Sequence, residues 1–155
     1  MQLRRSSLIV PYLISRAMSE QNLPKFSQFA VAQELLAKGE RVEMRVLGQS
    51  MLPFFISGQK IKLRPITEQD FKRYNVVFAK DTRKGFVVHR IIAFKGDDVI
   101  LLGDGNIYQA ETIARNCVYG IVECSPLHIF FAKMWVAMRR FRRFPLAIFR
   151  RITPK

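Results

Sequence analysis

Short runs of alternating polar and apolar residues occupy most of the chain between residues 41 and 122. Alternation with a period of two predicts β-strands, because successive side chains of a strand point to opposite faces of its sheet. Glycine, asparagine and aspartate separate the runs and indicate turns. The pattern predicts strands at residues 41–47, 60–64, 75–80, 85–94, 99–102 and 118–122. We therefore expect a small, mainly β body in the middle of the chain.

The segment before this β body has a helical spacing of apolar residues. Residues 27–39 carry an apolar stripe and predict a short helix that covers one face of the sheet. Ser27 is a candidate N-cap, and Gly39 follows the last predicted turn. Residues 67–71 predict one further helical turn in a connection between strands.

The segment after Pro126 also has a helical spacing, and its polar positions are basic. Its apolar stripe consists of Leu127, Phe130, Phe131, Met134, Met138 and Phe141. Arg139, Arg140 and Arg143 fall on the opposite side, so the pattern predicts an amphipathic helix, which Pro145 should bend or end. Two arrangements fit this pattern. The apolar stripe could pack on the sheet with the basic face in solvent, or the helix could lie on an anionic membrane surface.

The composition is that of a folded domain with a basic appendage. The 155 residues are 49% hydrophobic and 25% charged, and the formal net charge is +14. No acidic residue occurs after residue 126, so much of the excess charge lies in the tail. We therefore divide the chain into an N-terminal extension (1–25), a β domain with its leading helix (26–125) and a basic amphipathic tail (126–155). The tail predicts an anionic membrane surface as a partner, and we expect no specific nucleic acid.

The N-terminal region has neither a membrane span nor a good signal peptide. No uncharged apolar run approaches the ~18 residues that a transmembrane helix needs. Residues 7–14 are apolar but are interrupted by Pro11. Met18 is an alternative translation start, and in that case residues 1–17 would not belong to the fold.

Cys117 and Cys124 lie close together in the sequence but lack the spacing of a metal site. We expect no metal and no cofactor. The two thiols fit either buried residues in a reducing compartment or a short disulfide in an oxidising one. The whole pattern favours a cytoplasmic or peripheral-membrane protein over a secreted one.

Ser50 is the candidate nucleophile. It follows a predicted strand that ends at Gly48, and it precedes Pro53, which excludes regular structure. The hydroxyl should therefore lie on an irregular, partly exposed segment. An ordinary turn serine that bonds its own backbone would give the same local pattern.

Other segments of the chain add chemistry to this serine. Val87-Val88-His89 places an imidazole in an apolar strand, and Gly103-Asp104-Gly105-Asn106 places a carboxylate at a tight turn. The ordered set resembles the motifs of type I signal peptidases and their LexA-like relatives. It comprises Gly48-x-Ser50-Met51-x-Pro53, Val76-Val77-Phe78, His89-Arg90-Ile91, Gly103-Asp104-x-Asn106 and Gly120-Ile121-Val122.

The resemblance covers residues 42–122 and is to the subgroup in which histidine is the base, as in the endoplasmic-reticulum and archaeal enzymes. It implies a small signal-peptidase-like or LexA-like β body. The chain departs from the family pattern where Gly58-Gln59 and Tyr74-Asn75 replace Gly-Asp pairs. The family's second acid, shortly after the Gly-Asp turn, has no aspartate counterpart, and Glu111 is the nearest carboxylate.

The resemblance implies a serine endopeptidase with Ser50, His89 and Asp104 as its catalytic residues. Ser50 would attack a peptide carbonyl, His89 would carry the proton, and Asp104 would orient the imidazole. Backbone N–H groups around Ser50 would bind the oxyanion.

The same resemblance implies that Met51, Pro53 and Phe54 line an apolar substrate pocket, although core packing would equally place apolar side chains there. The expected partner is an extended segment of a precursor or secreted polypeptide. Two other functions fit the sequence. One is a catalytically inactive peptide- or membrane-binding module of the same fold. The other is a LexA-like regulator, against which the lack of a preceding helix-turn-helix pattern argues.

Overall fold

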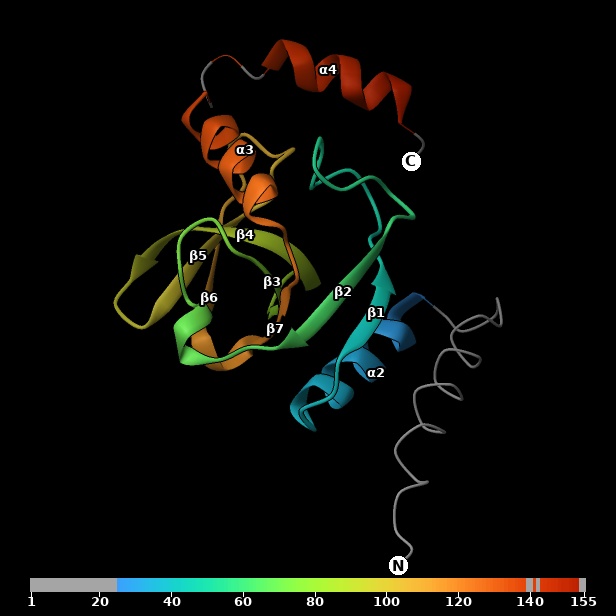
Figure 1. Cartoon of the computed structure of the whole chain (residues 1–155), viewed down its shortest axis with the longest axis vertical. Coiled ribbons are helices and arrows are strands. Elements are labelled where there is room, and N and C mark those ends of the chain that lie inside the picture. The colour runs from blue at the N-terminus through green and yellow to red at the C-terminus, as the bar shows by residue number, and fades with distance from the viewer. Residues whose placement is uncertain (1–24, 139–140, 142, 154–155) are drawn as a thin grey trace, which may run out of the picture.

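The computed structural model describes residues 25–138, 141 and 143–153. Its centre is one antiparallel sheet with the strand order β1-β2-β7-β3-β4-β5-β6. The strands are β1 (Val42–Arg45), β2 (Lys60–Pro65), β3 (Val76–Asp81), β4 (Gly85–Lys95), β5 (Asp98–Leu102), β6 (Glu111–Ala114) and β7 (Val118–Val122). Figure 1 shows the strongly curved sheet with helices at two of its sides. The prediction of a small, mainly β body is confirmed.

Strand β6 is the one strand of the described sheet that the hydrophobic pattern did not predict. Its four residues alternate between buried and exposed positions. The first inward position is Glu111, whose side chain is only 2% exposed. A carboxylate at a core-facing position interrupts the alternation of apolar residues, so the hydrophobic pattern did not predict a strand here. A buried carboxylate of this kind needs a polar partner.

Helix α2 (Lys25–Ala37) covers the part of the sheet formed by β1, β2 and β7. It begins two residues before the predicted start, and Gly39 follows it with a φ of 86°. Ala32 and Leu36 are buried in the core cluster on this face. A Cβ on Gly120 of β7 would lie only 2.9 Å from a methyl carbon of Leu36. The predicted packing role of this helix is therefore confirmed.

The C-terminal segment forms two helices instead of one. Helix α3 (Pro126–Ala137) is capped by the Ser125 hydroxyl, which accepts a hydrogen bond from the backbone N–H of His128. Helix α4 (Arg143–Ile152) follows and contains Pro145 in its first turn. N–H groups in the first turn of a helix have no acceptor within the helix, so a proline there costs no helical hydrogen bond.

The prediction of one helix that reaches Pro145 is thus wrong. Arg139, Arg140, the side chain of Arg143 and the extension before residue 25 lie outside the described residues. The predicted helical turn at residues 67–71 is present as a 3-10 turn (Glu68–Asp70), and a second such turn lies at Arg115–Cys117. Within the described residues, no helix is long and apolar enough to span a membrane.

Candidate active site

Ser50 lies in the irregular connection between β1 and β2, as the sequence predicts. Gly48 takes a φ of 82°, which a glycine adopts without strain, and turns the chain away from β1. The backbone then coils tightly, because the N–H of Leu52 bonds the carbonyl of Gln49 and those of Phe54 and Phe55 bond the carbonyl of Met51. Ser50 itself is half-buried at the start of this coil.

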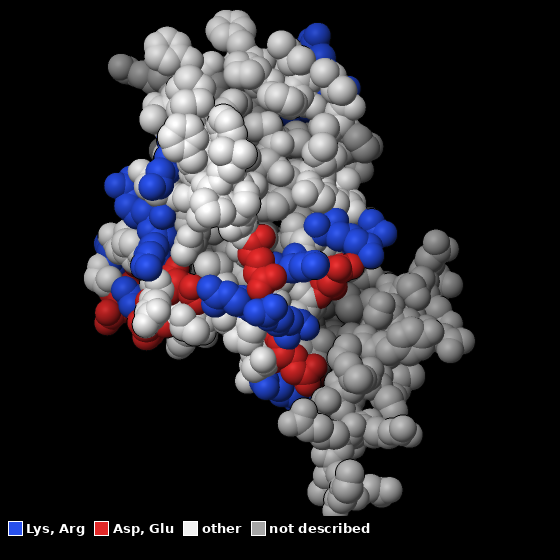
Figure 2. Space-filling view, in the orientation of Figure 1, with Lys and Arg blue, Asp and Glu red and all other residues white. Residues whose placement is uncertain are grey.

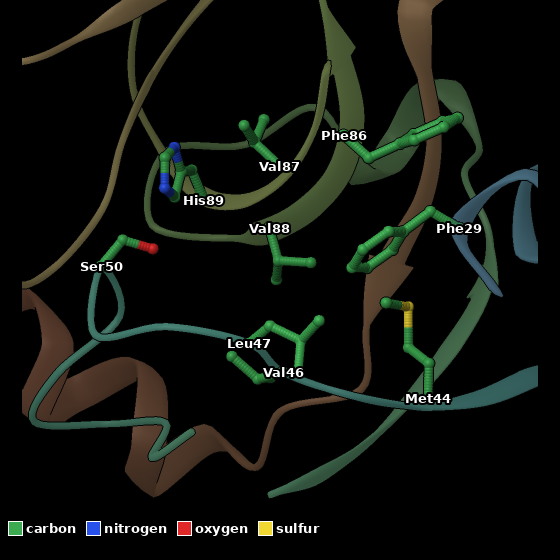
Figure 3. A pocket seen from close by; sticks show the side chains of 9 residues that line it. All are labelled: Phe29, Met44, Val46, Leu47, Ser50, Phe86, Val87, Val88 and His89. Carbon is green, nitrogen blue, oxygen red and sulfur yellow. The ribbon is translucent and has the colours of Figure 1, made fainter. Parts of the chain in front are cut away.

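His89 lies in β4 and faces Ser50 from the other side of a pocket. Its side chain is 6% exposed. Figure 3 shows the Ser50 hydroxyl and the His89 ring at one end of the pocket, each pointing toward the other. In the described part of the chain, no hydrogen bond joins them. Catalytic hydrogen bonds are often long in ligand-free structures and tighten with substrate.

The Gly103–Asn106 turn packs directly against both groups. The backbone N–H of Gly105 donates to the carbonyl oxygen of Ser50 at 2.7 Å. A Cβ on Gly103 would lie 2.4 Å from that same oxygen and 3.1 Å from Nε2 of His89. Only glycine fits between them. The turn therefore fixes the serine segment relative to the imidazole.

Glu111 is the carboxylate that contacts the imidazole. Its Oε2 lies 2.9 Å from Nδ1 of His89, and its Oε1 accepts a hydrogen bond from Nζ of Lys84 at 2.7 Å. Burial acts to raise the pKa of Glu111, but the hydrogen bonds from His89 and Lys84 outweigh it and hold this pKa below its ordinary value. The charged carboxylate can therefore accept a hydrogen bond from an Nδ1–H group of His89. This leaves Nε2 on the side of Ser50 and Gly103.

Asp104 has a different partner from the expected one. Its two carboxylate oxygens accept hydrogen bonds from Nε and Nη2 of Arg90, at 2.8 and 2.6 Å. The Arg90 side chain is fully buried and that of Asp104 is 2% exposed. The expectation that Asp104 orients His89 is therefore corrected by this geometry. The side chains of neighbouring strand residues point to opposite faces of the sheet. Arg90 therefore pairs with Asp104 on one face of β4, and His89 contacts Glu111 on the other.

The Arg90–Asp104 pair is joined to the Tyr74 turn by one further contact. Nη1 of Arg90 donates to the backbone carbonyl of Tyr74 at 2.6 Å. Tyr74 has a φ of 78°, a left-handed conformation that costs a non-glycine residue about 1–3 kcal/mol. Its carbonyl also satisfies a donor of the buried guanidinium.

The C-terminal helices contact the turns that carry Ser50 and Asp104. The indole N–H of Trp135 in α3 donates to the backbone carbonyl of Asp104 at 3.0 Å. In α4, the guanidinium of Arg150 donates to the carbonyl of Gly105 at 2.8 Å. Leu52, two residues after the candidate nucleophile, packs with Trp135 and Leu146 in a separate apolar cluster. The predicted basic tail is therefore part of the scaffold of the site.

The pocket beside Ser50 is mostly apolar, with about 420 Å³ of space when its open mouth is included. Figure 3 shows α2, the end of β1 and the start of β4 contributing side chains to it. Its lining consists of Phe29, Met44, Val46, Leu47, Ser50, Phe86, Val87, Val88 and His89. It can accept an apolar side chain next to the serine.

The predicted substrate-binding residues are not part of this lining. Met51 is fully buried in the main core. Phe54 packs against Trp135 and His128 and lies under the Arg90 guanidinium, at 5.3 Å from its ring centre. Pro53 follows a cis peptide bond in the same loop. Core packing, the alternative that the sequence left open, therefore describes Met51 and Phe54 better.

The remaining candidates for chemistry are structural. His128 packs between two phenylalanine rings, and burial together with the nearby Arg90 charge lowers its pKa. Cys117 and Cys124 are free thiols, and burial raises the pKa of Cys124 to about 11. No group of three or more histidine, cysteine or acidic side chains among the described residues could hold a metal ion.

No family model matches the chain, and a search of curated proteins found no significant match.

Proposed function

We propose that this protein is a serine endopeptidase of signal-peptidase-like type that uses Ser50, His89 and Glu111. One observation carries the proposal. A hydroxyl, an imidazole and a buried carboxylate, which come from three separate segments of the chain, form an ordered series beside an apolar pocket. Nucleophile, base and orienting acid are the three groups of a serine triad.

The reaction follows the order of these groups. Ser50 Oγ attacks the carbonyl carbon of the peptide bond, and its proton passes to Nε2 of His89. Glu111 holds the proton on Nδ1 and balances the imidazolium charge. The tetrahedral intermediate then expels the amine, which takes the proton from Nε2, and leaves an acyl-enzyme. Water, deprotonated by the same imidazole, releases the acid and frees Ser50.

Two strand edges next to the pocket support an extended polypeptide as the substrate. Among residues 25–138, strand β1 pairs only with β2, and the first part of β4, up to His89, pairs only with β3. The end of β1 and the start of β4 supply opposite walls of the pocket. A peptide laid between them could hydrogen-bond to either edge and place alternate side chains in the apolar pocket.

The resemblance of residues 42–122 to histidine-type signal peptidases supports the same assignment. The alternative is a catalytically inactive peptide-binding module. The lack of a Ser50–His89 hydrogen bond in the described chain is the observation that favours it. Both alternatives use the pocket, so they differ only in whether the serine reacts.

Labelling with a fluorophosphonate probe separates the two. Wild-type protein should be labelled on Ser50, while Ser50→Ala should not be labelled and should cleave no peptide in a library of extended apolar sequences. His89→Ala should lose labelling to the same extent, and the double variant should be no slower than either single variant. Thermal unfolding of each variant shows whether it folds. A folded wild type that binds peptides from the library but is neither labelled nor active would overturn the proposal and establish the binding module.

A further inference from the structure

The outer surfaces of α3 and α4 form a continuous exposed apolar region. On the face drawn in Figure 2, the described residues at this end of the molecule show few charged side chains, with basic ones at its upper edge, while basic and acidic side chains gather on the β body below it. Several side chains are more than half exposed, including Phe144 at 83% and Ile152 at 74%. We call this region the apolar cap. Its members are Leu127, Phe130, Phe131, Met134, Met138, Phe141, Phe144, Ile148, Phe149 and Ile152.

The apolar cap is not required to hold the helices on the body. Helix α3 buries Ala132 and Trp135 on its inner side, and α4 buries Leu146. The predicted stripe of α3 points outward, so the arrangement in which this stripe packs on the sheet does not occur. Contiguous exposed apolar patches of several hundred Å² mark interaction surfaces in soluble proteins.

The charge of the same segment identifies its occupant. The basic residues after residue 126 are Lys133, Arg139, Arg140, Arg142, Arg143, Arg150, Arg151 and Lys155, and no acidic residue accompanies them. Apolar side chains flanked by lysine and arginine are what an anionic lipid surface binds, because the rings enter the acyl boundary while long basic side chains reach the phosphates. A second copy of the chain would bring together two proteins of net charge +14.

We propose that the apolar cap docks this protein on the surface of anionic membranes. The inner sides of the same helices contact the catalytic turns, through Trp135 to Asp104 and through Arg150 to Gly105. Docking therefore places the Ser50 turn close to the lipid surface. Taken with the proposed function, on which this second step rests, the substrates are polypeptide segments that lie at that surface.

Vesicle co-sedimentation of the full chain tests the docking. Vesicles of phosphatidylcholine alone are compared with vesicles of phosphatidylcholine and phosphatidylglycerol, at low and high salt. Wild type should bind the anionic vesicles at least 10-fold more tightly, and raised salt should weaken this binding. The double variant Phe130→Ser/Phe144→Ser should bind about 10- to 100-fold more weakly, since two aromatic side chains no longer leave water.

The matched control replaces two exposed apolar residues of α2 and β4, Val31 and Phe94, with serine. This control should bind vesicles as wild type does. Equal binding by both double variants, or equal binding to neutral and anionic vesicles, would overturn the proposal. So would a concentration-dependent dimer, or nucleic-acid binding, that depends on Phe130 and Phe144 while vesicles are not bound.

The catalytic proposal is tested separately from the docking. Ser50→Ala should bind vesicles as wild type does. If the wild type binds vesicles but is not labelled by the probe, the catalytic proposal is refuted and the docking proposal stands. If vesicles are bound but do not accelerate cleavage of a lipid-anchored peptide over the same peptide in solution, the substrate class is refuted and the docking stands.

Discussion

The contact between His89 and Glu111 gives the sharpest prediction, which is the effect of Glu111→Gln. Glutamine keeps the size of the side chain but removes the charge that balances the imidazolium. Its amide N–H can also bond Nδ1 of His89 and hold the proton on Nε2, which would leave Ser50 without a base. The corresponding loss of an orienting carboxylate in a serine triad lowers kcat by about 10⁴. We expect a fall in kcat of about 10³- to 10⁴-fold, with little change in KM.

Glu111→Gln should lower the stability moderately, because it removes the contribution that the charged carboxylate makes above its folded-state pKa. The Lys84 side chain that loses its partner is 45% exposed and can be solvated, which limits the loss. Asp104→Asn should lower the stability much more. It removes the charge partner of the fully buried Arg90, and breaking a buried ion pair from one side costs about 3–5 kcal/mol of unfolding free energy. The melting temperature should fall by roughly 10–20 °C.

Two measurements decide between the two carboxylates. Single-turnover cleavage or probe labelling, carried out well below the melting temperature of Asp104→Asn, gives the rate of the chemical step, and thermal unfolding gives the stability. We expect slow chemistry with a small fall in melting temperature for Glu111→Gln, and a large fall in melting temperature with a much smaller kinetic loss for Asp104→Asn. If Asp104→Asn loses the chemical step as fully as Ser50→Ala while it remains folded, and Glu111→Gln does not, then the assignment of Glu111 is refuted.

Two further predictions follow from contacts around the site. Gly103→Ala should abolish labelling, because its Cβ would lie 2.4 Å from the backbone oxygen of Ser50. Gly96→Asn, at an exposed turn, should be tolerated. Equal labelling of the two variants would mean that the Gly103 turn is not tightly packed against Ser50. Wild type should lose stability as the pH falls through the lowered pKa of Glu111, and Lys84→Met should flatten this dependence, as measured by urea unfolding between about pH 2.5 and 5.

The sign of the Glu111 prediction follows from linkage. A carboxylate whose pKa is lower in the folded state binds its proton more weakly there than in the unfolded chain. Its stabilising contribution is therefore complete above the unfolded-state pKa of about 4.3 and is lost as the pH falls through the folded-state value. Lys84 contributes to the lowering, so its removal brings the two pKa values closer together and reduces the loss.

The sequence alone determined the features of this protein that depend on residues adjacent along the chain. Alternation of apolar residues predicted six of the seven strands of the described sheet, because each strand's pattern is local. Gly48 and Pro53 likewise placed Ser50 on an irregular segment, and the apolar run around His89 placed this residue in a strand. The helical spacing before residue 40 predicted α2 for the same reason.

Only the tertiary structure decided which groups meet. Strand β6 was missed because Glu111 occupies an inward position, and the pairing of β4 with β5 and of β5 with β6 brings this carboxylate to His89. Asp104 lies next to the serine turn, yet the buried guanidinium of Arg90 takes both of its oxygens. A carboxylate contacts whichever buried donor the strand register places within reach, and register is fixed by the packing of the whole sheet, so the partner of a carboxylate cannot be inferred from its distance along the chain.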